Sequence, residues 1–213
     1  MTTKIGVIAD AGPVLTFLAR KEWTRILYTG LRGQPFAVPA TVEREVLRIA
    51  KRDRRFAAVS GQWTKLRNAD KIVVLSDDVT SELDRVVARI DGTPLAQRLN
   101  SGKDLGELMV ISHAVVLAEQ AQTVTVIIQE GNGTALARRE ASRLSRIAAG
   151  AESTTSSGAL QVWSVDCVLQ AARSAGCPQI PDQTAMKKLW ADMRGYDDAL
   201  PPIGQTSLLA PDL

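Results

Sequence analysis

Acidic residues stand at a strand end or a helix start in four places along the chain. They are Asp10, the pair Glu43 and Glu45, the pair Asp104 and Glu107, and Glu130. Hard divalent cations prefer oxygen ligands, and Mg²⁺ is typically held by one or a few carboxylates while it keeps several waters. Such an ion lowers the pKa of a bound water and stabilises charge on a phosphate undergoing in-line attack. The acidic residues therefore point to metal-dependent chemistry on phosphate esters.

A structural role is the alternative for most of these acids. Acidic side chains in the first turn of a helix complement the helix macrodipole, which accounts for both acidic pairs without any chemistry. The stretch from Ser101 to Asp104 also comes close to a capping box. Asp10 differs, because a capping role is less obvious for a carboxylate directly after a buried strand. It stands where open α/β sheets place their chemistry, past the carboxyl end of a strand.

The elements that would position these acids alternate along the chain. Short apolar runs bounded by Gly or Pro predict strands at residues 5–9, 35–39, 71–75, 123–128 and 160–165. Apolar residues at helical spacing predict helices, the clearest at residues 13–18, 41–49, 80–90, 104–120, 134–147, 167–175 and 182–194. Thr41 is expected to be an N-cap, and residues 91–103 are expected to form a loop. This alternation predicts an α/β protein with a three-layer fold, in which helices flank a mostly parallel central sheet.

The bulk composition fits one globular domain with a terminal extension. The 213 residues are 45% hydrophobic, which is enough for a single core. The chain shows neither a signal-peptide core nor a run of about 18 uncharged apolar residues, so a cytoplasmic protein is expected. Cys167 and Cys177 show no metal-ligand spacing and are expected to be reduced thiols. A net charge of +3 permits an anionic partner such as nucleic acid.

The histidine and the basic runs can be explained by structural roles alone. His113 is the only histidine, and a spacing of six residues does not place it on the same helix face as Glu107, so a structural role is expected. The basic runs at residues 48–55 and 138–146 are expected to be solvated helix faces. If they flank the acidic edge, they would bind RNA phosphates and make the affinity salt-dependent.

Five stretches of the chain carry a family resemblance. They are Asp10–Leu15, Val38–Val46, Asp104–Glu107, Val126–Gly131 and Trp163–Leu169. In order and spacing they resemble the successive motifs of the PIN-domain family, and the chain is most similar to the branch related to VapC-type toxins of bacterial toxin–antitoxin pairs. The resemblance covers about residues 5–195. It implies a PIN-like nuclease domain over residues 1–195, followed by a Pro-rich C-terminal tail over residues 196–213.

The resemblance implies a ribonuclease whose acids hold Mg²⁺ or Mn²⁺ at the carboxyl edge of the sheet. Asp10 matches the first acid of the family and Glu107 the third. Glu45, rather than Glu43, matches the second, because it stands three residues after a valine and directly before an apolar residue. The catalytic residues implied in this way are Asp10, Glu45, Asp104 and Glu107. The implied metal ligands are the same four residues and Glu130.

The sequence departs from the family pattern at two positions. The family usually has an aspartate directly after its fourth strand, where this chain has Gln129. Glu130 or Asp166 could restore the missing charge. A serine or threonine that often follows the first aspartate by two residues is replaced by Gly12. Both departures would weaken metal binding or metal selectivity.

Two functions of different classes are consistent with these residues. The first is a metal-dependent endoribonuclease that hydrolyses RNA phosphodiester bonds as the toxin of a toxin–antitoxin system. Its expected partners are RNA, a cognate antitoxin protein and a second copy of the chain in a homodimer, with no membrane. The alternative is a degenerate PIN domain that binds RNA or protein without catalysis. Action on DNA is also open, because phosphodiester chemistry at such a site does not itself distinguish the sugars.

Overall fold

Five short strands of mostly buried residues form the centre of the fold. The structure is a computed structural model and describes residues 5–102, 104–129, 131–150 and 158–209. The strands are β1 Val7–Ala9, β2 Phe36–Pro39, β3 Ile72–Leu75, β4 Val124–Ile127 and β5 Leu160–Trp163. They pair in the order β3-β2-β1-β4-β5, and every pairing is parallel. The predicted α/β fold with a parallel central sheet is confirmed.

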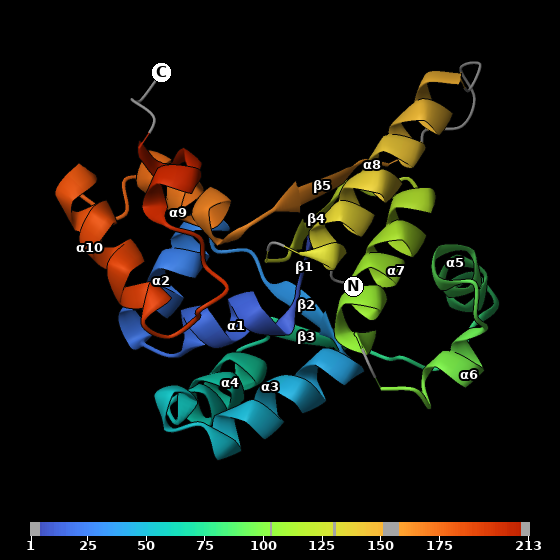
Figure 1. Ribbon diagram of the computed structural model, residues 1–213, viewed down its shortest axis with the longest axis horizontal. Helices are drawn as coiled ribbons and strands as arrows, with labels where there is room; N and C mark the ends of the chain where they lie inside the picture. Colours follow the sequence, from blue (N-terminus) through green and yellow to red (C-terminus); the bar gives the residue numbers. More distant parts are fainter. Residues whose placement is uncertain (1–4, 103, 130, 151–157, 210–213) are drawn as a thin grey trace.

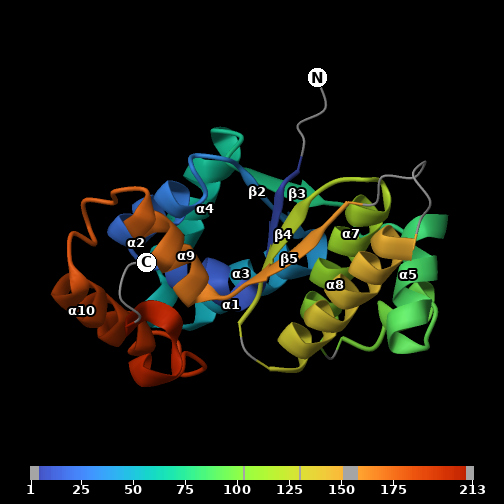
Figure 2. The ribbon, with the colours of Figure 1, turned by 90° about the horizontal axis from the view of Figure 1, so that it is seen from above.

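Helices cover both faces of this sheet. They are α1 Ala11–Leu18, α2 Lys21–Gly30, α3 Ala40–Arg52, α4 Val59–Asn68, α5 Ser81–Asp91, α6 Leu95–Arg98, α7 Leu105–Glu119, α8 Asn132–Gly150, α9 Val165–Ser174 and α10 Gln183–Arg194. Helices α2 and α9 lie on one side of the sheet, and α7 and α8 lie on the other with α5 outside them (Figures 1 and 2). None of the described helices combines the length and the apolar composition that a membrane span requires.

The buried core lies between the helices and the sheet. Strand β4 is buried along its whole length, as expected for a strand with parallel neighbours on both edges and helices on both faces. A second, smaller apolar cluster joins α5 and α6 to α7 through residues such as Leu83, Leu95 and Met109. Apolar side chains thus fix α7 on two sides, against the sheet and against α5.

The prediction that residues 91–103 form a loop is wrong in part, because this segment contains helix α6. Pro94 precedes this helix in an extended conformation, and the backbone N–H of Leu95 donates to Oδ1 of Asp84 at 2.7 Å. The side chain of Leu95 is fully buried. A contact with a residue of α5 and burial therefore stabilise a helix of only one turn, which the local sequence does not indicate.

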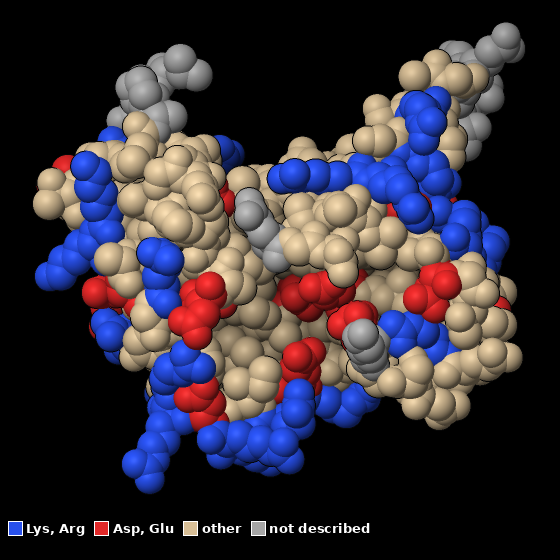
Figure 3. All heavy atoms as spheres, viewed as in Figure 1, with Lys and Arg blue, Asp and Glu red and all other residues tan. Residues whose placement is uncertain are grey.

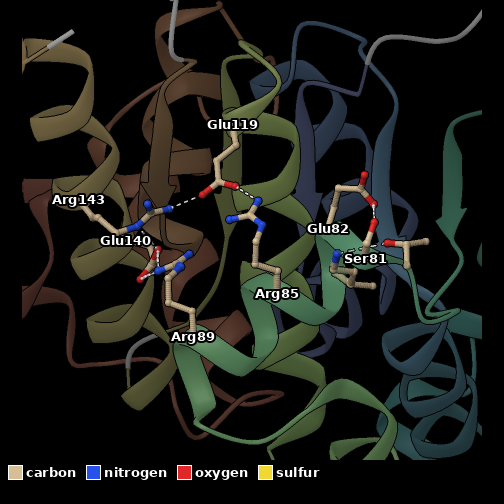
Figure 4. Close-up of polar contacts among 9 residues, drawn as sticks. Ser81, Glu82, Arg85, Arg89, Glu119, Glu140 and Arg143 are labelled. Atoms are coloured by element: carbon tan, nitrogen blue, oxygen red, sulfur yellow. Dashed lines mark hydrogen bonds and ion pairs between the residues drawn. The ribbon is translucent and has the colours of Figure 1, made fainter.

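Charged side chains connect α5, α7 and α8 at the periphery (Figure 4). Nη1 of Arg89 donates to both carboxylate oxygens of Glu140 at 2.8 Å. Arg143 donates to Glu140 at 2.8 Å and to Glu119 at 2.7 Å, and Glu119 also accepts from Arg85. Burial raises the pKa of Glu119, but the two guanidinium groups outweigh it and hold this pKa below its usual value. The network keeps α8 in a fixed position against α7.

The described part of the C-terminal tail packs against the domain. Leu200 and Leu208 are buried in the same apolar core as the strands, and Nε1 of Trp190 donates to the carbonyl oxygen of Pro201 at 3.0 Å. Gln183 of α10 also donates to the carbonyl oxygen of Leu208. The division of the chain at residue 195 stays a prediction.

Candidate functional site

Asp10 lies directly after β1, in the middle of the sheet. Its backbone N–H donates to the carbonyl oxygen of Ile127 at 2.9 Å, so the parallel pairing with β4 continues to this residue. The chain then turns into α1, in which Pro13 occupies the first turn, a position that tolerates the missing N–H of proline. The end of the strand and the immediate start of a helix leave the Asp10 carboxylate at the carboxyl edge of the sheet.

The four predicted catalytic acids line one cavity at this edge. The cavity has a volume of about 570 Å³ and is lined by Asp10, Glu45, Asp104 and Glu107 together with Arg44 and Arg48. Asp10 precedes α1, Glu45 comes from α3, and Asp104 and Glu107 come from the start of α7. Acidic side chains gather in a hollow on this face, with Lys and Arg side chains over α8 on one side and over α3 on the other (Figure 3). The structure therefore brings these four acids together.

Gly106 lies where α3 and α7 approach one another at the cavity. A β-carbon on this residue would lie 3.1 Å from Oε2 of Glu45 and 3.7 Å from Oδ1 of Asp10. It would also lie 3.6 Å from a methyl group of Val42. The missing side chain of Gly106 thus lets two carboxylate oxygens from different elements approach the same point.

Glu107 lies against the beginning of α8. Its carboxylate accepts a hydrogen bond from the backbone N–H of Gly133, the second residue of this helix. A β-carbon at Gly133 would come within 2.7 Å of Oε2 of Glu107 and 2.6 Å of Cδ1 of Ile128, so only glycine fits without displacing a neighbour. A carboxylate at a helix N-terminus is favoured by the macrodipole. The Glu107 side chain is therefore positioned by α8 as well as by its own helix.

The electrostatics of the cavity disfavour the ionised forms of Asp10 and Glu107. The pKa of Asp10 is raised to about 7, mainly by burial, and the nearby carboxylates of Glu107 and Glu45 contribute to this rise against the lowering effect of the Ala11 N–H. Burial and the charge of Asp104 likewise raise the pKa of Glu107. Like charges that share a partly desolvated site repel one another, and a bound cation would relieve this repulsion.

The donor atoms around Asp10 suit a hard divalent cation. Carboxylate oxygens are the ligands that Mg²⁺ and Mn²⁺ prefer, and Mg²⁺ is commonly bound by one or two carboxylates with waters in its other positions. Asp10 and Glu45 supply such a pair around Gly106. Across the described residues, no group of three or more Asp, Glu, His or Cys side chains is arranged so that it could hold a metal ion. The residues therefore fit an ion held by two carboxylates and waters, in a cavity that Glu107 and Asp104 also line.

The candidates for a fourth acid differ in where they lie. Glu130 is outside the described residues. Asp166 is at the start of α9, where its carboxylate accepts hydrogen bonds from Ser164 and Ser207 and is thus engaged with the C-terminal segment. Gln129 follows β4 at the same edge as Asp10 and is buried, and its Oε1 has no partner among the described residues. A neutral amide therefore stands where the PIN pattern has an aspartate.

Two arginines of α3 also line the cavity: Arg48, which begins the basic run predicted at residues 48–55, and Arg44, which the sequence did not single out. Arg44 and Arg48 do so with largely exposed side chains. Their spacing of four residues places them on one helix face, and Arg44 directly precedes Glu45 in the chain. This spacing from Arg48, beside a predicted metal ligand, is the signal that could have identified Arg44.

Comparison of the chain with models of protein families, with curated proteins and with solved structures finds no match. The function is therefore inferred from the residues and their arrangement.

Proposed function

We propose that the protein is a metal-dependent endoribonuclease of the PIN type. The observation that carries the proposal is the cavity at the carboxyl edge of a parallel sheet, in which Asp10, Glu45, Asp104 and Glu107 come together. The order and spacing of the five motifs, which resemble those of the family, support it independently. Both lines of support lead to the same four acids.

The residues of the cavity divide into two chemical groups. Asp10 and Glu45 would hold Mg²⁺ or Mn²⁺, and a bound ion would supply a water of lowered pKa and stabilise negative charge on the phosphate. Arg44 and Arg48 are exposed at the same cavity, and guanidinium groups bind phosphate oxygens in a bidentate manner. The cavity thus combines oxygen ligands for a cation with cations for the phosphate backbone.

The basic helix faces on either side of the cavity favour a polynucleotide over a small phosphate ester. The exposed residues Arg138 and Arg139 lie on α8, and Arg44 and Arg48 lie on α3. In Figure 3 the basic side chains flank the acidic hollow on both sides. A strand that crosses the hollow would therefore meet positive charge before and after the acids, which gives the salt-dependent affinity of nucleic-acid binding.

The resemblance to VapC-type toxins extends the proposal to the cellular role. We infer a cytoplasmic toxin that forms a homodimer and is neutralised by a cognate antitoxin protein. The test of this part is co-expression with a small antitoxin-like protein encoded next to the gene, which should restore growth that the toxin alone arrests.

The test of the nuclease activity is the cleavage of single-stranded RNA in Mn²⁺ by the wild type and by Asp10→Asn. We expect the wild type to cleave and Asp10→Asn to lose at least about 100-fold in rate while it remains folded by circular dichroism. Asp78→Asn is the matched control, because it removes the same charge from an exposed residue outside the cavity. Equal cleavage by Asp10→Asn and the wild type would refute the assignment.

The second candidate is a degenerate PIN domain that binds RNA or protein without catalysis. Gln129 favours it, because a buried neutral amide stands in place of the usual aspartate. Calorimetric titration separates the two functions. Absence of Mn²⁺ binding together with retained RNA binding supports the binding module, whereas Mn²⁺ binding that Asp10→Asn abolishes supports the nuclease.

A further inference from the structure

Asp77 is a buried carboxylate that lies outside the cavity, two residues after β3. Its Oδ2 accepts from the backbone N–H of Thr41 at 2.6 Å and from the Thr41 hydroxyl at 2.5 Å. Its Oδ1 lies 3.2 Å from Nε2 of His113. Three polar contacts from two different helices therefore converge on one side chain.

The contact with Thr41 caps helix α3 from a distant part of the chain. The helix begins at Ala40 after Pro39, and Pro39 provides no side-chain cap. The expectation that Thr41 is the N-cap is therefore wrong, because Thr41 is already the second residue of the helix and its hydroxyl donates to Asp77. The first N–H groups of a helix have no partner within it, and a carboxylate commonly accepts from the second or third of them. Asp77 serves this purpose from 36 residues away.

The same carboxylate connects this cap to both walls of the cavity. His113 belongs to α7, the helix that begins with the acids Asp104 and Glu107 at the cavity. On the α3 side, Nη2 of Arg44 donates to Oγ1 of Thr41 at 2.8 Å, and it lies 4.0 Å from Asp77.

Asp77 is held in its charged form by these contacts. Burial raises the pKa of this carboxyl, but the hydrogen bonds from His113 and from Thr41 outweigh the effect of burial and lower it. An ionised side chain accepts hydrogen bonds at both oxygens and is held by both helices at once. A cap for α3 alone would require only the contacts with Thr41, and the contact with His113 goes beyond that need.

We propose that Asp77 is a positioning residue, which fixes the first turn of α3 against α7 and thereby places Arg44 and Glu45 at the cavity that contains Asp10. The role of the cavity in this statement rests on the function proposed above. Asp77 itself does not line the cavity. It acts on phosphate binding through Arg44 and on the metal site through Glu45.

The first test compares Asp77→Asn with Asp78→Asn. Both remove one negative charge, but Asp78 is exposed whereas Asp77 is buried. Thr41 and His113 contact different oxygens of Asp77. In asparagine one of these positions is an NH2 group that only donates, so the side chain cannot accept from Thr41 at one position and from His113 at the other. For Asp77→Asn we expect kcat/KM for RNA and the affinity for Mn²⁺ each to fall about 10-fold or more, as for other residues that orient metal ligands. For Asp78→Asn we expect both within about twofold of the wild type.

A second pair of variants separates positioning from simple stabilisation. Thr41→Ser keeps both donors to Asp77 and should retain wild-type kinetics. Thr41→Val keeps the N–H but loses the hydroxyl that Arg44 and Asp77 share, so KM should rise more than kcat falls. All rates are measured well below the melting temperature, with the folded fraction checked by circular dichroism. Folded Asp77→Asn and Thr41→Val with wild-type kinetics and Mn²⁺ affinity would overturn the proposal.

A structural readout keeps this proposal separate from the proposed function. His113 is the only histidine of the chain, so its ring signals in an NMR spectrum report on the contact with Asp77. In Asp77→Asn these signals should shift, and exchange of the Thr41 amide hydrogen should accelerate. If the wild type cleaves no RNA, the nuclease assignment fails while these signals still decide whether Asp77 holds α3 against α7. Unchanged signals and unchanged exchange would overturn the positioning role whatever the activity.

Discussion

Replacement of Asp10 by asparagine should make the metal-free protein more stable at pH 8. Burial is the main cause that raises the pKa of the wild-type carboxyl from 3.8 to about 7, and the charges of Glu107 and Glu45 contribute to the rise. Asparagine has nearly the same shape, and its oxygen can still accept the hydrogen bond from the Ala11 N–H. The substitution therefore removes the cost of a charge and leaves the packing in place.

The size and the pH range of this effect follow from the two pKa values. A carboxyl with a raised pKa in the folded state favours the protonated form, so it has no effect on stability below pH 3.8, where both states are protonated. Between 3.8 and about 7 the folded state loses stability as the pH rises. Above that range the ionised Asp10 lowers the stability of the folded state by at most about 4 kcal/mol, because each unit of pKa corresponds to roughly 1.4 kcal/mol.

Urea denaturation in the presence of EDTA measures the difference between Asp10→Asn and the wild type from pH 4 to pH 8. The difference should be near zero at pH 4 and should grow to about 2–4 kcal/mol in favour of the variant at pH 8. Mn²⁺ should stabilise the wild type and not the variant. Asp78→Asn, which removes an exposed charge, should show no such trend. A difference that stays flat with pH would refute the reasoning about Asp10.

Two further substitutions probe the scaffold and the cavity. Glu140→Ala leaves the partly buried guanidinium of Arg89 without its bidentate partner. It should therefore lower the free energy of unfolding by about 3 kcal/mol, as measured by urea denaturation. A loss below about 0.5 kcal/mol would contradict the role of the network. Gly106→Ala places a methyl group 3.1 Å from Oε2 of Glu45. It should weaken Mn²⁺ binding roughly 10-fold without loss of helix stability. An unchanged Mn²⁺ affinity in calorimetry would contradict this prediction.

The strands could be predicted well because the residues that specify each strand are neighbours in the sequence. Each is a short run of apolar residues between turn residues, and the alternation with helices leaves a parallel sheet as the natural arrangement. The same rule places Asp10 at the carboxyl edge of the sheet, next to the starts of the helices that carry Glu45 and Glu107. Helix α6 could not be predicted in this way, because its single turn depends on the contact between Leu95 and Asp84.

Asp77 escaped prediction for a related reason. From the sequence, Thr41 has the type and position of an N-cap, and Asp77 is one of two acids after a strand. The capping interaction joins residues 36 positions apart, and no local pattern specifies such a contact. The arrangement becomes visible only when β2 and β3 lie side by side, because their parallel pairing from Phe36 and Ile72 onward brings the two strand ends together.

Gln129 has a physical rationale in the same electrostatics that govern Asp10. The pairing of Ala9 with Ile127 places Gln129 just beyond β4 at the edge where Asp10 follows β1. The pKa of Asp10 is already about 7 with Glu45 and Glu107 nearby, so a further buried carboxylate would add repulsion and desolvation in the absence of a cation. A neutral amide avoids that cost, and its oxygen has no hydrogen-bond partner among the described residues. Gln129→Asp should therefore destabilise the metal-free protein above pH 7, and Mn²⁺ should restore its stability, which thermal denaturation with and without the ion can measure.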